Sequence, residues 1–362
     1  CQSCRIQIRV MGLLQFQNTG ISGLAAAVPR KVINNYDPNL YFREEEVNEV
    51  IEKIGVKERR FVDQDTCSSD LCFAAAEKLI SEMGLNREEI DLLIFISQTP
   101  DYRMPATSIL LQERLKLPTS TIAFDINLGC SAFLYGLTIA FSMLSCGGFR
   151  KALILDGETR SKVYSLKDRK TGFLFGDGGI AALVENKEIF RNSWFSLNSD
   201  GSRENLIKIP AGGYRKMSSC ETVTEKVIDE YGNIRSEEHG YMNGADVFNF
   251  VIREVPRDFN RLLDFSAVEL NSIDYFIFHQ ANSYINGFLA KKLKLPLDKI
   301  PSTIEKYGNT SSVSIPLTIV SELRGKLSGH KRLLLSGFGV GLTWGTALID
   351  LEDCYITEIV EV

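Results

Sequence analysis

The chain has 362 residues, 44% hydrophobic and 24% charged, a composition typical of globular proteins with a substantial core. Its formal net charge of −5 argues against a general nucleic-acid-binding protein. No uninterrupted apolar run reaches the roughly 18 residues that a membrane span needs, and no secretory signal pattern is present. We therefore expect a cytoplasmic protein that binds neither membranes nor nucleic acids.

The eight cysteines are scattered, and none of their spacings supplies the two ligand pairs of a zinc site. Cys1 and Cys4 form a CxxC pair, and Cys67 and Cys72 lie close together in the sequence. We expect reduced thiols and no bound metal. Residues 1–10 are interpreted as an upstream extension.

The first half of the chain alternates helical and strand-like patterns. An amphipathic helix with a serine cap and a terminal glycine is predicted over 68–84. Buried strands are predicted over 91–97, 121–127 and 151–157, and a glycine-rich turn followed by a strand over 175–185. Continuous apolar strands between helices are typical of a mostly parallel sheet covered on both faces.

The second half of the chain repeats the first at an offset of about 180 residues. Three matches at one offset indicate an internal duplication. We expect two α/β halves, 11–189 and 190–362, related by a pseudo-twofold axis. The matching pairs of segments are 88–98 with 271–281, 124–133 with 303–312, and 151–158 with 331–338.

Cys130 begins a segment that is apolar on nearly every face. A strand-like run leads into Gly129, and residues 132–144 then read as a helix. A helix that is apolar all round is buried. Its N-terminus would favour the thiolate form of the cysteine. A packed core cysteine is the alternative interpretation.

Two further polar residues stand in apolar, repeated surroundings. Asn309 follows a glycine at a helix start, as Cys130 does, and His279 ends a predicted strand. A structural histidine and a helix-capping asparagine are the alternatives. The other histidines, His239 and His330, lie in polar stretches and are expected to be exposed.

Cysteine, histidine and asparagine together are suited to acyl transfer. A thiolate attacks a thioester or amide carbonyl, and imidazole and amide N–H groups hold an enolate oxygen. A carboxylate base is not required if the carbanion is generated by decarboxylation.

Four motifs resemble the signature blocks of β-ketoacyl-acyl-carrier-protein synthase III, a family of the thiolase superfamily. They are GCSAFLYGL, HQAN, YGNTSSVSIP and GFGVGLTWGTAL, which contain Cys130, His279, Asn309 and Phe338 respectively. Three more blocks, ERRF, SQTPDYRMPATS and DRKTGFLFGDGGIAAL, match in the same order. The resemblance spans roughly residues 13–350 and implies a thiolase-like fold of five layers, α-β-α-β-α.

The resemblance also implies a mechanism. Cys130 would accept an acyl group from an acyl thioester, with the acyl oxygen held by the backbone N–H groups of Cys130 and Val340. His279 and Asn309 would stabilise the enolate formed as malonyl-acyl-carrier protein loses CO₂. Phe338 would offer an apolar wall to the departing carboxylate.

Other expectations carried by the resemblance concern the pocket and the partners. Gly339 and Gly341 would let the backbone approach the substrate. Met104, before a proline, would line the acyl pocket and adapt to chains other than acetyl. The substrates would be thioesters of CoA or phosphopantetheine, with no further cofactor, and the protein would be a homodimer.

The carrier-binding side departs from the family pattern. Glu49 stands where members place a tryptophan that stacks on the CoA adenine, whereas its arginine partner is retained as Arg169. Lys291, Lys292 and Lys294 would dock an acyl carrier protein, although a solvated helix face explains a lysine run equally well. Free CoA thioesters are therefore expected to be poor donors.

The favoured activity is decarboxylative condensation of an acyl thioester with malonyl-acyl-carrier protein, as in fatty-acid biosynthesis. The nearest alternative is a specialised relative that acts in a secondary or saccharide pathway. A cysteine hydrolase is a remote alternative, since the order Cys, His, Asn also occurs in papain-like peptidases. A non-catalytic carrier-binding scaffold is a further class, disfavoured by the intact triad.

Overall fold

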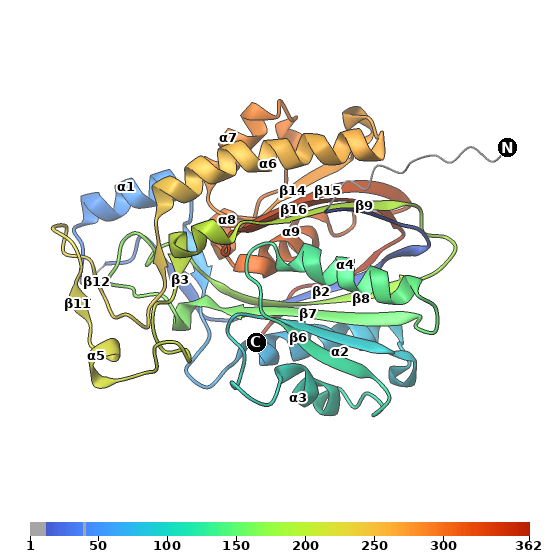
Figure 1. Cartoon of the computed structure of the whole chain (residues 1–362), viewed down its shortest axis with the longest axis horizontal. Coiled ribbons are helices and arrows are strands. Elements are labelled where there is room, and N and C mark those ends of the chain that lie inside the picture. The colour runs from blue at the N-terminus through green and yellow to red at the C-terminus, as the bar shows by residue number, and fades with distance from the viewer. Residues whose placement is uncertain (1–11, 39–40) are drawn as a thin grey trace.

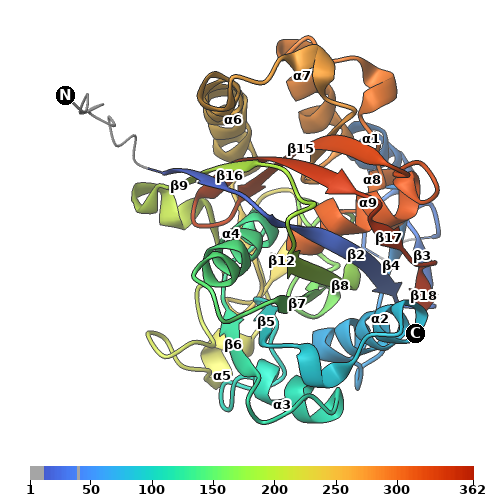
Figure 2. The ribbon, with the colours of Figure 1, turned by 90° about the vertical axis from the view of Figure 1, so that its right-hand side faces the viewer.

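The computed structural model describes residues 12–38 and 41–362 and has five layers, in the order α-β-α-β-α (Figure 1). Two β-sheets stack face to face with helices between them and on both outer faces, as the end-on view shows (Figure 2). The predicted layer arrangement is thereby confirmed. The presumed extension, 1–10, lies outside the described residues and with it Cys1 and Cys4.

The first sheet is built mainly from the first half of the chain. Its order is β17-β2-β8-β7-β5-β6, with β18 pairing with β2 outside this path. The predicted strands are present with small changes at their ends. The bounds are β2 Thr19–Val28, β5 Leu92–Ile96, β6 Ile122–Ile126, β7 Lys151–Thr159, β8 Asp177–Asn186, β17 Tyr355–Ile356 and β18 Val360–Glu361.

The second sheet repeats this arrangement. Its order is β1-β9-β16-β15-β14, so that β9, β16, β15 and β14 correspond to β2, β8, β7 and β5. The same pairs of neighbours are parallel or antiparallel in both sheets. The bounds are β1 Leu13–Phe16, β9 Ser193–Ser199, β14 Tyr275–Phe278, β15 His330–Gly339 and β16 Thr343–Glu352.

Both sheets are mixed, and the prediction of a mostly parallel sheet is confirmed for the first, where four pairings of the described strands are parallel and two antiparallel. It is wrong for the second, where one pairing of the described strands is parallel and three are antiparallel. β7 pairs with β5 in parallel but with β8 in antiparallel orientation, and β15 pairs likewise with β14 and β16. A strand buried on both faces is continuously apolar whichever way its neighbour runs, so composition carries no information about direction.

Three hydrophobic clusters fill the spaces between the layers. The central cluster holds α4 and α9 between the two sheets. A second cluster packs α2 and α3 against the first sheet, and a third packs α6 and α7 against the second. The bounds are α2 Ser68–Met83, α3 Thr107–Arg114, α4 Ala132–Ser145, α6 Gly244–Ser266, α7 Ser283–Lys292 and α9 Ser314–Leu323.

Helix α2 ends as predicted but begins differently. Gly84 adopts the left-handed conformation that closes a helix, in agreement with the terminal glycine of the pattern. The N-cap is Cys67 rather than a serine, and the carboxylate of Asp70 accepts its backbone N–H at 2.8 Å.

The two halves exchange their terminal strands. β1, near the N-terminus, pairs with β9 of the second sheet, whereas β17 and β18, near the C-terminus, pair with β2 of the first. Sequence periodicity shows that a strand exists but not which sheet receives it.

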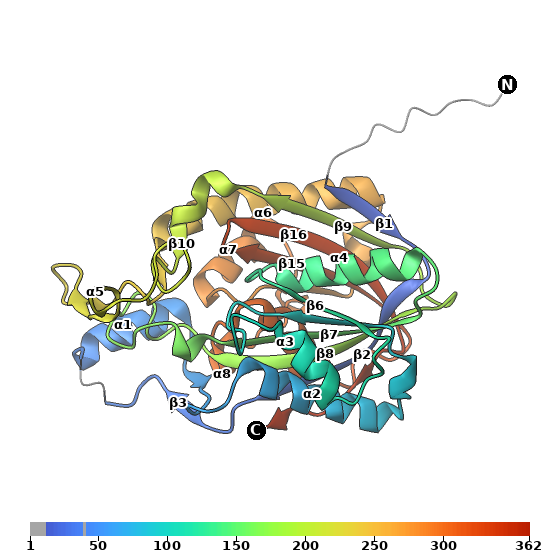
Figure 3. The same cartoon turned by 60° about the horizontal axis from the view of Figure 1, so that its bottom comes forward.

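One end of the molecule carries an excursion of the chain, residues 200–243, beside α1 Glu44–Ile54 (Figures 1 and 3). It contains short elements that the sequence patterns did not predict: β10 Ile207–Lys208, α5 Cys220–Val223, β11 Lys226–Val227, β12 Ile234–Arg235 and β13 Tyr241–Met242. The remaining short elements are β3 Val32–Asn34, β4 Glu58–Arg60 and α8 Ile304–Tyr307. No helix in the described part of the chain is long and apolar enough to cross a membrane.

Candidate active site

Cys130 lies in the tight turn that leads from β6 into α4. The amide of Ala132 donates to the carbonyl of Gly129 at 2.7 Å, which closes the turn, and Ser131 is the N-cap of the helix. The helix behind it is buried along most of its length, as predicted. Its aligned peptide dipoles therefore place partial positive charge near the cysteine.

The turn after β15 approaches this cysteine closely. A Cβ atom on Gly339 would lie 2.6 Å from Cys130 Sγ, so only glycine fits there. The backbone N–H groups of Cys130 and Val340 have no hydrogen-bond partner among the described residues. They are available to an oxygen beside the sulfur, as an oxyanion hole requires.

His279 follows β14 and is buried, with 2% of its surface exposed. Its Nδ1 lies 2.8 Å from the hydroxyl of Ser314, which also accepts the backbone N–H of Gln280 at 3.2 Å. Since that oxygen already accepts one hydrogen bond, its own proton is free for Nδ1. This assignment leaves Nε2–H as a donor toward the cavity. The ring of Phe338 packs edge-on against the imidazole with centroids 5.5 Å apart.

Asn309 is fixed by the backbone on both sides. Its amide N–H donates to the carbonyl of Leu174, and its carbonyl accepts from Gly176. The side-chain oxygen accepts the N–H of Ser311 at 2.9 Å, and Nδ2 donates weakly to the carbonyl of Ala281 at 3.4 Å. A second N–H of the carboxamide remains for a ligand.

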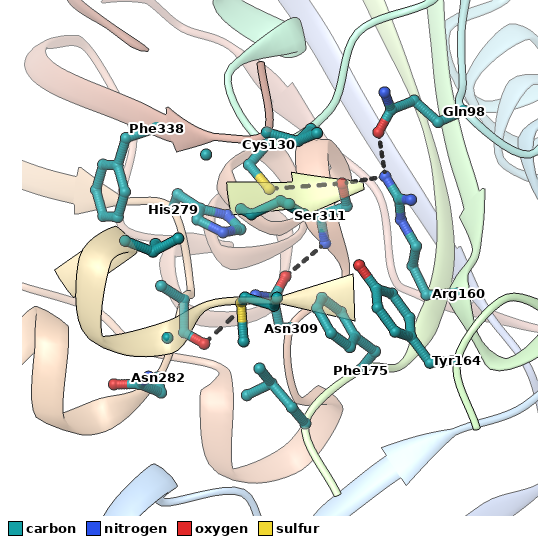
Figure 4. A pocket seen from close by; sticks show the side chains of 18 of the residues that line it. Gln98, Cys130, Arg160, Tyr164, Phe175, His279, Asn282, Asn309, Ser311 and Phe338 are labelled. Atoms are coloured by element: carbon teal, nitrogen blue, oxygen red, sulfur yellow. Dashed lines mark hydrogen bonds between the residues drawn. The ribbon is translucent and has the colours of Figure 1, made fainter. Parts of the chain in front are cut away.

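A buried ion pair lies beside the cysteine, and the sequence patterns did not single it out. The Nη2 of Arg160 donates to Glu158 and Ser311 at 2.8 Å each and to Gln98 at 2.9 Å. The hydroxyl of Ser311 in turn lies 3.8 Å from Cys130 Sγ (Figure 4). Ser311 belongs to the motif that contains Asn309, but Arg160 sits in the charged run ETRSK, which resembles a solvated surface.

The thiol of Cys130 is activated by these neighbours. Burial acts to raise its pKa, but the electrostatic interaction and the hydrogen bond with His279, then the interactions with Arg160 and Ser311, outweigh burial and lower the pKa from 9.0 to about 7. At neutral pH a large fraction is therefore thiolate, the nucleophilic form.

Cys130, His279 and Asn309 open onto one cavity of about 260 Å³. The structure thus brings the three predicted polar residues together, along with Phe338, Gly339 and Val340 of the predicted pocket. The excursion over 200–243 supplies further walls that sequence reasoning missed. The other lining residues are Gln98, Asn127, Arg160, Tyr164, Leu174, Phe175, Ile207, Lys208, Ile209, Met242, Gly244, Val247, Val251, Ala281, Asn282, Ile285 and Ser311.

A larger outer cavity of about 890 Å³, here called the vestibule, adjoins this site and shares part of its lining. Glu49 and Arg169 both line the vestibule, so the two positions implied for adenine binding do face one space. Arg169 is already paired, however, with Glu46 at 2.9 Å, and its guanidinium lies 5.3 Å from the ring centre of Tyr231. The vestibule therefore presents two carboxylates, Glu46 and Glu49, which would repel the phosphates of a nucleotide bound there.

Several predicted site residues lie elsewhere. Met104 is 77% exposed and does not line the cavity of its own chain, and Gly341 lies in the β15–β16 turn behind Val340. Both expectations were carried by the family resemblance, and a matched motif does not specify where a loop side chain points.

The three lysines at the end of α7 line neither cavity. Lys291, Lys292 and Lys294 are exposed, and Lys292 donates to the carbonyl of Ile252 at 2.6 Å. Lys291 and Lys292 lie on the same helix as Tyr284, which does line the vestibule, and Lys294 follows the end of that helix.

The two remaining histidines are partly buried rather than exposed. His239 accepts the backbone N–H of Ser236 at 3.0 Å, and burial lowers its pKa. His330 lies 3.2 Å from Asp350. In residues 12–38 and 41–362, no group of three or more His, Cys, Asp or Glu side chains is placed to hold a metal ion.

Comparison with known proteins is consistent with this geometry. The family model for 3-oxoacyl-[acyl-carrier-protein] synthase III matches residues 124–201, and the model for its C-terminal part matches 263–351. The chain is 36% identical over 334 residues to a β-ketoacyl-[acyl-carrier-protein] synthase III of Clostridioides difficile, covering 91% of this chain and 97% of that one. A relative of the same name from Desulfitobacterium hafniense is 34% identical over 336 residues, covering 92% and 97%.

A solved structure shows the same fold. The 3-oxoacyl-(acyl-carrier protein) synthase of Burkholderia xenovorans superimposes with a TM-score of 0.91 at 37% identity, covering 97% of this chain and 99% of that one.

Proposed function

Because the chain belongs to the 3-oxoacyl-[acyl-carrier-protein] synthase III family, we propose that it condenses an acyl thioester with malonyl-acyl-carrier protein. The products are a 3-oxoacyl-acyl-carrier protein and CO₂. The observation that carries the proposal is the convergence of a thiol of lowered pKa, an imidazole, a carboxamide and two unpartnered backbone N–H groups on one cavity.

The first half-reaction acylates Cys130. The thiolate attacks the carbonyl carbon of the acyl thioester, and the oxygen takes up negative charge beside the N–H groups of Cys130 and Val340. The bond to the donor sulfur then breaks, the donor leaves as a thiol with the proton that Cys130 gave up, and the acyl group stays on Sγ.

The second half-reaction forms the carbon–carbon bond. Malonyl thioester loses CO₂ beside the ring of Phe338, and the electron pair moves onto the thioester oxygen as an enolate. Nε2–H of His279 and Nδ2–H of Asn309 donate to that oxygen. The enolate carbon attacks the acyl carbonyl, the bond to Sγ breaks, and the Cys130 thiolate is regenerated.

The partners follow from the same proposal. Thioester carriers are the only cofactor-like groups that the reaction uses, and Lys291, Lys292 and Lys294 offer exposed positive charge to an acidic acyl carrier protein. Strand β6 is an edge of the first sheet, and exposed apolar side chains lie near it: Met104, Ile109 and Ile122. An unpaired edge of this kind favours a second copy of the chain and hence a homodimer.

Exchange of the nucleophile tests the proposal directly. Wild-type protein incubated with an acyl thioester should gain the mass of one acyl group, and Cys130→Ser protein should gain none although it folds. Added malonyl-acyl-carrier protein should discharge the adduct as 3-oxoacyl product and CO₂. An adduct that persists on Cys130→Ser, or one that only hydrolyses, would refute the assignment.

A further inference from the structure

One end of the inner cavity is polar. The two cavities share Leu174, Met242, Gly244, Asn282 and Ile285, which therefore mark the passage between them. Gln98, Asn127, Arg160 and Tyr164 line only the inner cavity. In Figure 4, Gln98, Arg160 and Tyr164 gather on one side of Cys130, whereas His279 and Phe338 lie on the other. A thioester that enters from the vestibule would direct its acyl chain beyond the sulfur toward this polar end.

Hydrogen-bond donors at this end lack partners. The side chain of Arg160 is 7% exposed, and its Nε–H is buried with no hydrogen-bond partner. The hydroxyl of Tyr164 and the Nε2 of Gln98 likewise have no hydrogen bond to any described residue, whereas the Gln98 oxygen is occupied by Arg160. Gln98 and Tyr164 are half-buried and line the cavity, so a hydrogen-bond acceptor that enters the cavity can reach their free donors.

No carboxylate of the described residues faces this end of the cavity. None of the described residues that line the cavity is an aspartate or a glutamate. Glu158 is fully buried and does not line the cavity. Its oxygens accept hydrogen bonds from Arg160, from the backbone N–H of Gln98 and from the hydroxyl of Thr99. It balances the charge of the guanidinium and leaves the donors facing the cavity unfilled.

We propose that Gln98, Arg160 and Tyr164 select an acyl chain that carries a hydrogen-bond-accepting oxygen close to the thioester. A hydroxyl, keto or carboxylate oxygen would serve, and the residues are specificity determinants of the condensation proposed above, on which this inference rests. The hydroxyl of Ser311 touches both the guanidinium and, at 3.8 Å, the sulfur, so the oxygen must lie within a few bonds of the acyl carbonyl.

A plain alkyl chain fits this end poorly for a physical reason. It would displace water from the donors without replacing the hydrogen bonds that water makes. Sites built to bind a polar group reject analogues that lack it far more strongly than apolar pockets reject one methylene. We expect a preference of at least tenfold in kcat/KM for acylation.

The test compares pantetheine thioesters, which avoid any effect of the CoA nucleotide. The rate of Cys130 acylation is followed by intact mass with 3-hydroxybutanoyl, succinyl and butanoyl thioesters. The variants are Tyr164→Phe, which keeps the ring that stacks on Phe175 at 3.9 Å between centroids, and Gln98→Met, which keeps the side-chain length. Tyr355→Phe, on the outer strand β17, is the matched control.

The measured quantity is the ratio of an oxygenated to the alkyl substrate within one variant. A merely structural role of these residues would change the reactivity of the thiol toward all thioesters alike, and such a change cancels in the ratio. Wild type and Tyr355→Phe should favour the 3-hydroxybutanoyl or the succinyl thioester at least tenfold, and the two arms distinguish a hydroxyl from a carboxylate. Tyr164→Phe and Gln98→Met should each reduce the ratio several-fold.

Two outcomes would overturn the inference. Equal rates for butanoyl and both oxygenated thioesters in wild type would refute it while leaving the condensation activity intact. A preference that neither variant changes would show that other residues select the chain. Acylation by none of the thioesters would refute both this inference and the proposed function.

Discussion

Replacement of His279 by alanine should affect the two half-reactions differently with pH. His279 is the largest of the influences that lower the pKa of Cys130 from 9.0 to about 7 against the opposing effect of burial. Without it the thiol should titrate near or above its ordinary value. Acylation should then be slow at neutral pH and recover at high pH. Condensation, which also needs Nε2–H as a donor to the enolate, should stay impaired at every pH.

The magnitude follows from the thiolate population. At pH 7 a thiol of pKa about 7 is roughly half ionised, and one of pKa about 9 is about 1% ionised, a difference of about 50-fold. The more basic thiolate is the better nucleophile, with a Brønsted coefficient of about 0.4–0.5, so a rise of about two pKa units increases its intrinsic rate by somewhat less than tenfold. Acylation at pH 7 should therefore fall about fivefold to tenfold and reach the wild-type rate by pH 9. Condensation should fall by about 10² or more, as for loss of an oxyanion donor.

The assay is the rate of Cys130 modification by iodoacetamide and by acyl thioester between pH 5.5 and 9.5, read by peptide mass spectrometry. This readout separates Cys130 from the exposed Cys146 and Cys220. Ser314→Ala is the matched control, because it removes the hydrogen bond to Nδ1 but retains the imidazole. Its midpoint should stay closer to that of wild type. Identical midpoints in wild type and His279→Ala, or an acylation defect that persists at pH 9, would refute the reasoning.

Two further predictions concern the carrier. The double variant Lys291→Glu, Lys292→Glu should have a raised KM for carrier-bound substrate at low salt. This effect should disappear at high salt, because exposed charges are screened beyond about 10 Å at 0.1 M. Lys326→Glu is the control, and an unchanged KM of the double variant at low salt would contradict docking at these lysines. Glu49→Trp should speed acylation by acyl-CoA about tenfold, since removing a carboxylate and adding a stacking surface is worth about 1.4 kcal/mol. Arg169→Ala should cancel most of that gain, and an unchanged or slower rate in Glu49→Trp would show that the adenine does not bind between these positions.

Much of the architecture was predictable because the relevant signals are local or repeated. A segment apolar on every face has to be buried, and α4 is. Two of the three matched pairs of segments fold alike, and four strands follow the same order in both sheets. The expected strand at the start of 303–312 is wrong, because Ile304–Tyr307 forms helix α8 and β6 has no counterpart among the described strands of the second sheet. Cys130, His279 and Asn309 could be selected because polar residues in apolar, duplicated surroundings are rare, and all three line one cavity.

The rest required contacts between distant parts of the chain. Arg160 reads in sequence as a surface charge and becomes an active-site group only because Glu158 neutralises it and Ser311, far along the chain, accepts its hydrogen bond. Met104 was expected in the pocket and is exposed instead. Residue type and spacing thus determined which side chains could perform the chemistry. Tertiary packing alone decided strand direction, the sheet that each terminal strand joins and the polar end of the cavity. These features depend on contacts with residues far away in the chain, which local sequence patterns do not specify.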